Sequence, residues 1–204
     1  MASVETSDSS VLNSKLAVKI LRRIAVQDEG DYGSSIADSL NKSQASVGRV
    51  IGDLNDIGFV EKGKREKAQY YEIDYDNVSD FWYRKVVEEL EEVDDDLKRE
   101  KYLGEGYTTK DEMLSGLKEN EGSIKRIVAA YLERVLQSDV RIERYTVSDL
   151  LFESVGFSVG HNIIQDDQLL ERYPYLREPI DALVYLWKMD GFPKLFRETL
   201  SQEE

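Results

Sequence analysis

The stretch SIADSLNKSQASVGRVIGDLNDIGFV, residues 35–60, decides the fold. Its apolar side chains recur at three- and four-residue steps in two runs, and the polar turn Asn41-Lys42-Ser43 separates the runs. This spacing places apolar side chains on one face of an α-helix. In the second run these residues are Val47, Val50, Ile51, Leu54 and Ile57. The stretch therefore predicts a short helix, a tight turn and a longer helix.

Capping signals define the ends of these two helices. Ser34 or Ser35 is expected to cap the short helix, and Ser43 the longer one. A serine hydroxyl at these positions accepts a hydrogen bond from a free N–H group of the first helical turn. Gly58 lies where a helix commonly ends with a left-handed residue, so we expect the longer helix to stop there.

The flanking segments add a helix before this stretch and a hairpin after it. Residues 12–26 show helical spacing of apolar side chains, with basic residues off that face, and the acid and glycine run at 28–31 is expected to end the helix. Residues 59–60 and 69–73 are rich in strand formers, and a polar, glycine-bearing segment separates them. The predicted order is three helices followed by a hairpin.

In order and spacing, these residues resemble a winged helix-turn-helix domain of the MarR- and ArsR-type transcriptional regulators of bacteria and archaea. The resemblance covers about residues 12–74. It implies that the third helix enters the major groove of DNA and that the hairpin, or wing, lies along the backbone or minor groove. The implied DNA-binding residues are Ser43 at a phosphate, Gln44, Ser46 and Arg49 at base edges, and Lys62, Lys64, Arg65 and Lys67 on the wing.

Charge is distributed unevenly along the chain. The 204 residues include 27 basic and 41 acidic side chains, a net charge of −14, whereas residues 42–70 hold six basic and four acidic side chains. An acidic surplus of this size excludes a histone-like coat for nucleic acid and is also typical of halophile proteins. We therefore expect DNA affinity to depend on the local basic segment.

Three alternative interpretations of the same residues stay open. A lysine-rich hairpin can serve only as a soluble sheet edge that discourages strand pairing. Arg49 can form an ion pair with Asp53, one helical turn away. A winged helix can also act as a protein-interaction or assembly module, for example in chromosome or plasmid maintenance, without reading DNA directly.

The chain changes character near residue 76. We predict a flexible tail over residues 1–10, a winged-helix DNA-binding domain over 11–76 and a helical dimerisation or regulatory region over 77–204. A helix capped by Asn77 or Ser79 is expected to run to about residue 103. Its apolar seam has the alternating three- and four-residue steps of paired helices, which predicts a homodimer. The seam residues are Tyr83, Val86, Leu90, Val93 and Leu97.

Composition excludes the enzymatic chemistry that needs cysteine or a pair of histidines. The chain has no cysteine and one histidine, His161, so thiolate nucleophiles and the usual zinc sites are excluded. Residues 156–160, Gly-Phe-Ser-Val-Gly, match a hydrolase nucleophile elbow, but the alternating strands and helices of that fold are missing. No apolar stretch is long enough to span a bilayer.

The fold class expected from the sequence is mainly α with a small β-hairpin wing. We expect a cytoplasmic protein that is not an enzyme and uses neither metal nor cofactor. Its expected partners are double-stranded DNA, a second copy of the chain, and an unidentified effector or a protein of the transcription machinery.

Overall fold

The computed structural model describes residues 10–27, 30–65, 68–92, 110–138, 142 and 144–151. The chain divides into two compact units. Residues 1–78 and 132–151 form the first, and residues 79–131 and 152–204 form the second. Residues 132–151 thus belong with the N-terminal unit, although the sequence places them in the C-terminal region.

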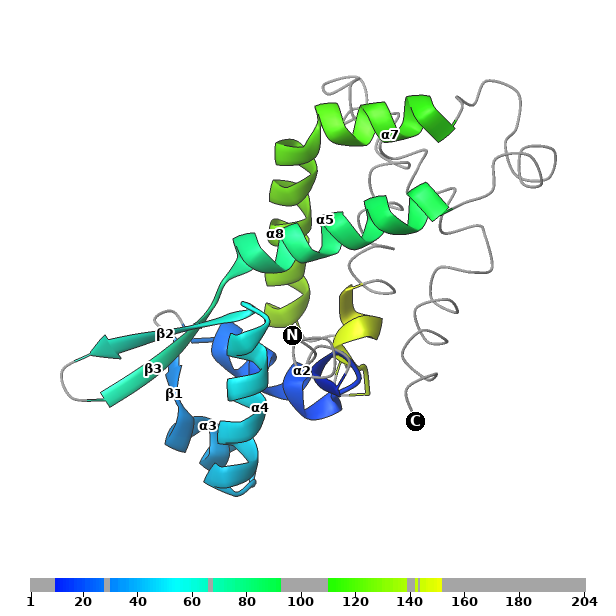
Figure 1. The fold of residues 1–204 in the computed structure, drawn as a ribbon. Coiled ribbons are helices and arrows are strands. Elements are labelled where there is room, and N and C mark those ends of the chain that lie inside the picture. Colours follow the sequence, from blue (N-terminus) through cyan, green and yellow to red (C-terminus); the bar gives the residue numbers. More distant parts are fainter. Residues whose placement is uncertain are drawn as a thin grey trace. The chain divides into compact units, whose positions relative to one another are not determined.

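In the described part of the first unit, helices α2, α3 and α4 form the core (Figure 1). Helix α2 spans Lys15–Ala25 and begins at Ser14, whose hydroxyl accepts a hydrogen bond from the backbone N–H of Ala17 at 3.2 Å. Helix α3 spans Gly33–Ser39 and helix α4 spans Gln44–Asp56. Their apolar faces pack into one core, in which the side chains of Ile20, Ile36, Ile51 and Leu54 are fully buried.

A small antiparallel sheet completes this core. Its strands are β1 (Asp31–Tyr32), β2 (Val60–Arg65) and β3 (Ala68–Ile73), in the order β1-β3-β2. Asp31 pairs with Tyr71 in β3, and Val60 pairs with Ile73. The base of the β2–β3 hairpin is anchored by the buried residues Phe59 and Val60, while its far end projects away from the three helices (Figure 1).

An ion pair ties β1 to α2. The Asp31 carboxylate accepts a hydrogen bond from Arg23 Nε at 2.7 Å and another from the backbone N–H of Tyr32 at 2.8 Å. Asp31 is only 5% exposed, so its charge depends on these donors for stabilisation. Neither this strand nor this ion pair was predicted, because two residues are too few to show the alternation of a strand.

Residues 132–151 join the first unit through polar and apolar contacts. Arg22 donates a hydrogen bond to the carbonyl of Ser138 at 2.8 Å, and Gln137 donates one to the carbonyl of Ala25 at 3.1 Å. Thr146 and Asp149 form a reciprocal capping box, with hydrogen bonds of 3.0 and 3.1 Å. The short helical turn they start buries Val147, Leu150 and Leu151.

Three further helices are described: α5 (Tyr75–Glu92), α7 (Lys110–Glu119) and α8 (Glu121–Gln137). Within the second unit, Lys125 on α8 forms ion pairs with Asp80 and Glu121, and its ammonium lies 5.1 Å from the ring centroid of Tyr83. The ion pair lowers the pKa of Asp80 and raises that of Lys125. The ion pair between Asp80 and Lys125 thus stabilises the charged form of each of these two groups.

The coarse fold prediction is confirmed, because the described residues are mainly helical with a small antiparallel sheet. Ser43 caps α4 and Gly58 is left-handed (φ 78°), as expected. Two predicted caps are wrong. Tyr32 precedes α3 directly from strand β1, so neither Ser34 nor Ser35 caps it. Asn77 and Ser79, the expected caps of α5, lie inside that helix. The Asp74 carboxylate holds the first turn instead, accepting a hydrogen bond from the backbone N–H of Asn77 at 2.9 Å.

Candidate nucleic-acid interface

Helix α4 presents one buried and one exposed face. Its buried side chains are Val47, Val50, Ile51 and Leu54. On the opposite face Gln44 and Arg49 are exposed, while Ser46 is half-buried. The Ser43 hydroxyl accepts a hydrogen bond from the backbone N–H of Ser46 at 3.2 Å, and its own proton remains available for an anionic oxygen. The predicted base-reading residues therefore begin the helix, and the largest of them point to solvent.

The connection between α3 and α4 is short and hydrogen-bonded. Asn41 adopts a left-handed conformation (φ 50°), which asparagine tolerates better than most residues. The backbone N–H of Lys42 bonds the carbonyl of Ala37 at 3.0 Å, closing the end of α3. This hydrogen bond and the backbone conformation of Asn41 hold the turn that orients α4 relative to α3.

The hairpin arranges its cations by strand register. Lys62 pairs with Tyr71 and Lys64 with Gln69, so the two lysines share one face of β2. On the other face Gly63 lies opposite Tyr70, and a Cβ at Gly63 would stand 2.2 Å from the Tyr70 ring. The ring thus lies directly over the glycine backbone, a close approach that a larger residue prevents.

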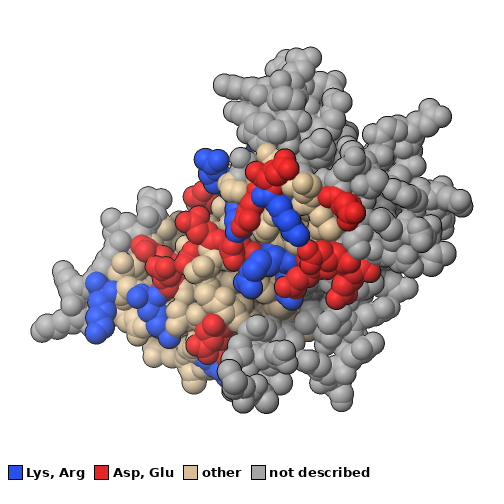
Figure 2. All heavy atoms as spheres, turned by 45° about the horizontal axis from the view of Figure 1, so that its top comes forward, with Lys and Arg blue, Asp and Glu red and all other residues tan. Residues whose placement is uncertain are grey.

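The other two predicted wing cations are less fully described. Arg65 pairs with Ala68 through the backbone, and its side chain lies outside the described part of the structure. Lys67 lies outside the described residues altogether. Figure 2 shows Lys and Arg side chains at the left of the view, where the hairpin lies in Figure 1, with carboxylates next to them.

Three of these cations have no carboxylate partner in the described structure: Arg49, Lys62 and Lys64. All three side chains are exposed. The described structure contains no ion pair between Arg49 and Asp53, so the alternative interpretation of Arg49 as a partner of Asp53 is wrong. Unpaired cations on α4 and the hairpin are the electrostatic requirement for binding a phosphate backbone.

Carboxylates gather at the base of the hairpin. Glu61 pairs across the sheet with Glu72, and Asp74 follows β3. A hydrogen bond with Asp74, and then the negative charge of Asp74, raise the pKa of Glu61. The negative potential at the base repels an anionic ligand, so any phosphate contact of the hairpin is restricted to the part beyond Glu61.

Two glycines on α4 were not singled out by the sequence analysis. A Cβ placed on Gly48 or Gly52 meets nothing within 4 Å. Packing within the chain therefore does not require glycine at either position, although glycine costs about 1 kcal/mol relative to alanine inside a helix. Gly48 is exposed and Gly52 is half-buried, and a glycine on an exposed helix surface permits close approach of another molecule.

The predicted dimer residues are only partly described. Tyr83 and Val86 are buried within the second unit of a single chain. The Tyr83 hydroxyl is buried without a hydrogen-bond partner. The side chain of Leu90, and residues Val93 and Leu97, lie outside the described part of the structure. A dimer seam that used Tyr83 or Val86 would require repacking of this unit.

The described residues contain no group of three or more His, Cys, Asp or Glu side chains placed to hold a metal ion. Ser158 and His161 lie outside these residues, as do the rest of the Gly-Phe-Ser-Val-Gly string and the aromatic C-terminal end. Within the described ranges, no helix is long and apolar enough to cross a bilayer.

Comparison with known proteins returns no match for this chain among protein-family models, curated proteins or solved structures.

Proposed function

We propose that residues 11–76 form a winged helix-turn-helix domain and that the protein is a sequence-specific DNA-binding transcriptional regulator of the cytoplasm. The observation that carries the proposal is the set of exposed, unpaired cations at Arg49, Lys62 and Lys64 in a chain of net charge −14. In a chain with 41 carboxylates, cations without partners on one helix and its adjoining hairpin favour a role for an external anion.

In this proposal α4 enters the major groove with its N-terminal half. Gln44 and Arg49 are exposed there and match the hydrogen-bonding edges of adenine and guanine respectively. Gly48 lies between them on the exposed surface, and its lack of a side chain permits the helix backbone to approach the DNA closely. Lys62 and Lys64 then neutralise phosphates beside the groove.

The regulator is proposed to act as a homodimer. Two copies place their recognition helices about 34 Å apart, one turn of DNA, and so favour inverted repeats. Bound there, the dimer controls access of the transcription machinery.

The test is a fluorescence-anisotropy titration of the full chain with a pool of genomic duplex fragments at low salt. We expect the triple variant Arg49→Ala, Lys62→Ala, Lys64→Ala to bind at least about a hundredfold more weakly, since each lost phosphate or base contact costs about 1 kcal/mol or more. The matched control is Arg84→Ala, Lys85→Ala, Lys118→Ala, which removes the same charge from the second unit. Equal loss in both variants contradicts the site assignment.

Gly48→Ala separates DNA binding from folding. The variant is expected to be more stable by up to about 1 kcal/mol, because alanine is the better helix former, yet to bind DNA about tenfold more weakly. Gly52→Ala, one turn further from the helix N-terminus, should gain similar stability and lose less affinity. Urea denaturation and the same anisotropy titration measure both quantities. Unchanged affinity in Gly48→Ala contradicts close approach at this position.

The second candidate is a winged-helix interaction or assembly module that does not read DNA. The carboxylates Glu61, Glu72 and Asp74 at the base of the hairpin favour it, since they oppose a phosphate backbone. The low-salt titration separates the two proposals, because this module leaves the duplex unbound.

A further inference from the structure

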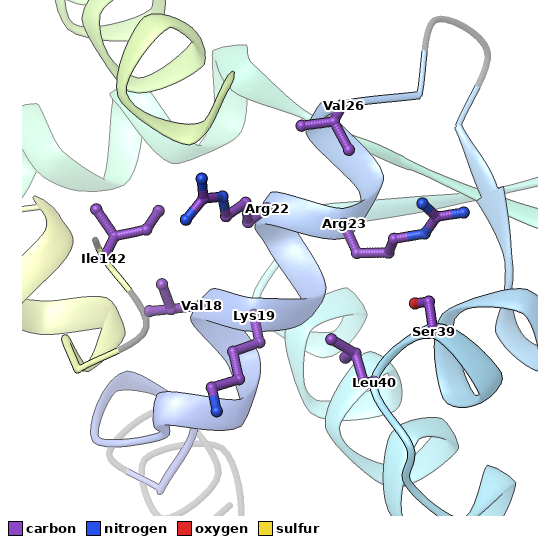
Figure 3. Close-up of a pocket in the computed structure, with 8 residues that line it drawn as sticks. All are labelled: Val18, Lys19, Arg22, Arg23, Val26, Ser39, Leu40 and Ile142. Atoms are coloured by element: carbon purple, nitrogen blue, oxygen red, sulfur yellow. The ribbon is translucent and has the colours of Figure 1, made fainter. Parts of the chain in front are cut away.

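A second cationic surface lies on α2, whose sequence KLAVKILRRIA contains four basic and no acidic residues. Beside this helix a groove of about 470 Å³ opens within the first unit (Figure 3). Its lining comes from α2, from the end of α3 and from one later residue. The lining residues are Val18, Lys19, Arg22, Arg23, Val26, Ser39, Leu40 and Ile142.

Half of this lining is aliphatic. Figure 3 shows Val18 and Ile142 facing each other, and Leu40 on the α3 side of the groove. Val26 is 47% exposed, the largest exposure of any bulky apolar side chain in the described residues. Aliphatic surface open to water gains about 25 cal/mol for each Å² that a ligand covers. The volume also falls in the range of small-molecule sites.

Three of the eight lining residues are cationic, namely Lys19, Arg22 and Arg23, and among the described residues no carboxylate contributes to the lining. Arg23 is held by Asp31 and, at 3.4 Å, by the hydroxyl of Ser35, while Arg22 donates to the carbonyl of Ser138. Lys19 is half-buried and has no hydrogen-bond or ion-pair partner in the described structure. The Lys19 ammonium is therefore partly removed from water without a counter-ion, which favours binding of an anion from solution.

We propose that this groove binds a small organic anion with an aliphatic body, of the medium-chain fatty carboxylate class. The carboxylate pairs with Lys19, and the aliphatic tail covers the exposed surface of Val26 and Leu40, since Val18 and Ile142 are already buried. None of the described lining residues is aromatic, which favours an aliphatic body over a ring that would stack. The inference is independent of DNA binding, so its failure leaves the proposed function standing.

The experiment is a titration of the full chain with octanoate, followed by calorimetry and by amide chemical shifts. Shift changes are expected in residues 18–26 and 39–40. Acetate carries the charge without the alkyl tail, and octanol carries the alkyl tail without the charge. Both are expected to bind at least about tenfold more weakly than octanoate.

Lys19→Gln is expected to weaken octanoate binding about tenfold, the usual size of a lost charged hydrogen bond. Because Lys19 has no partner in the described structure, the variant should keep its urea midpoint. The matched control Lys15→Gln removes an exposed cation from the same helix, one turn away and outside the groove, and should bind octanoate as the parent does. Equal affinity for octanol and octanoate, equal loss in both variants, or shifts spread outside the groove would overturn the proposal.

Discussion

In the second unit Arg84, Lys85 and Lys118 each lie 2.7–3.0 Å from a carboxylate oxygen, whereas Arg49, Lys62 and Lys64 of the first unit have no carboxylate partner in the described structure. Both groups are largely exposed, so burial does not explain the difference. Carboxylates outnumber cations 41 to 27 over the chain. Lys15 and Lys42 are also exposed without a carboxylate partner in the described structure, so it is the grouping of Arg49, Lys62 and Lys64 on α4 and the adjoining hairpin that favours our proposal of an external anion.

Arg23 belongs to the first unit but resembles the paired cations, and its substitution should have the largest effect on folding. Arg23→Ala leaves the Asp31 carboxylate, whose side chain is 7% exposed, without its counter-ion. We expect the free energy of unfolding to fall by about 3 kcal/mol. Urea denaturation measures this. Arg49→Ala is the control and should change stability by less than about 0.5 kcal/mol. A similar loss of unfolding free energy in both variants would contradict the distinction between paired and unpaired cations.

Gly63→Ala tests whether the hairpin holds its unpaired cations in a fixed geometry. The added methyl group meets the Tyr70 ring at 2.2 Å, so the ring or the strand has to move. Overpacking of this kind costs about 2 kcal/mol. Urea denaturation and amide exchange of residues 60–65 measure the loss. A variant as stable as the parent, with unchanged exchange in β2, contradicts the described register.

Lys125→Met tests a paired cation of the second unit. Its ammonium holds Asp80 and Glu121, and we expect a loss of about 1 kcal/mol, limited by the exposure of both carboxylates. The pKa of Asp80 is lowered in the fold, so its stabilising effect is present above the unfolded pKa and disappears as pH falls through the lowered value. The raised pKa of Lys125 makes its contribution disappear at high pH.

Urea midpoints of parent and Lys125→Met across the pH range measure this dependence. The difference between the two proteins should be largest near neutral pH and shrink toward both extremes. A difference that is constant with pH shows that the loss comes from packing alone.

Local signals in the sequence were sufficient for α4 and for the presence of a hairpin, but not for the length of β2, which includes residues 61–65 that were expected in the polar segment between the strands. Ser43 and Gly58 mark the two ends of the helix by short-range hydrogen bonding and by backbone conformation, which depend on few neighbours. The exposed positions of Gln44 and Arg49 follow from the period of the helix.

Features that depend on contacts between distant residues could not be predicted in this way. Strand β1 has two residues and exists because Asp31 and Tyr32 pair with β3, about 40 positions later. Arg23 lies off the apolar face of its helix, and the sequence pattern does not show that it pairs with the buried Asp31. The place of Gly63 beneath Tyr70 follows from strand register, which the residue types alone do not fix.

The most direct measurement of the central claim is the salt dependence of duplex binding by the parent and by the Arg49→Ala, Lys62→Ala, Lys64→Ala variant. Each neutralised phosphate contributes about 0.9 to the slope of log affinity against log salt, and Lys62 and Lys64 are the two cations assigned to phosphates, so the triple substitution should lower the slope by about 2. The charge-matched variant of Arg84, Lys85 and Lys118 should keep the slope of the parent. A slope that is the same for parent and Arg49→Ala, Lys62→Ala, Lys64→Ala contradicts the proposal that these unpaired cations bind DNA.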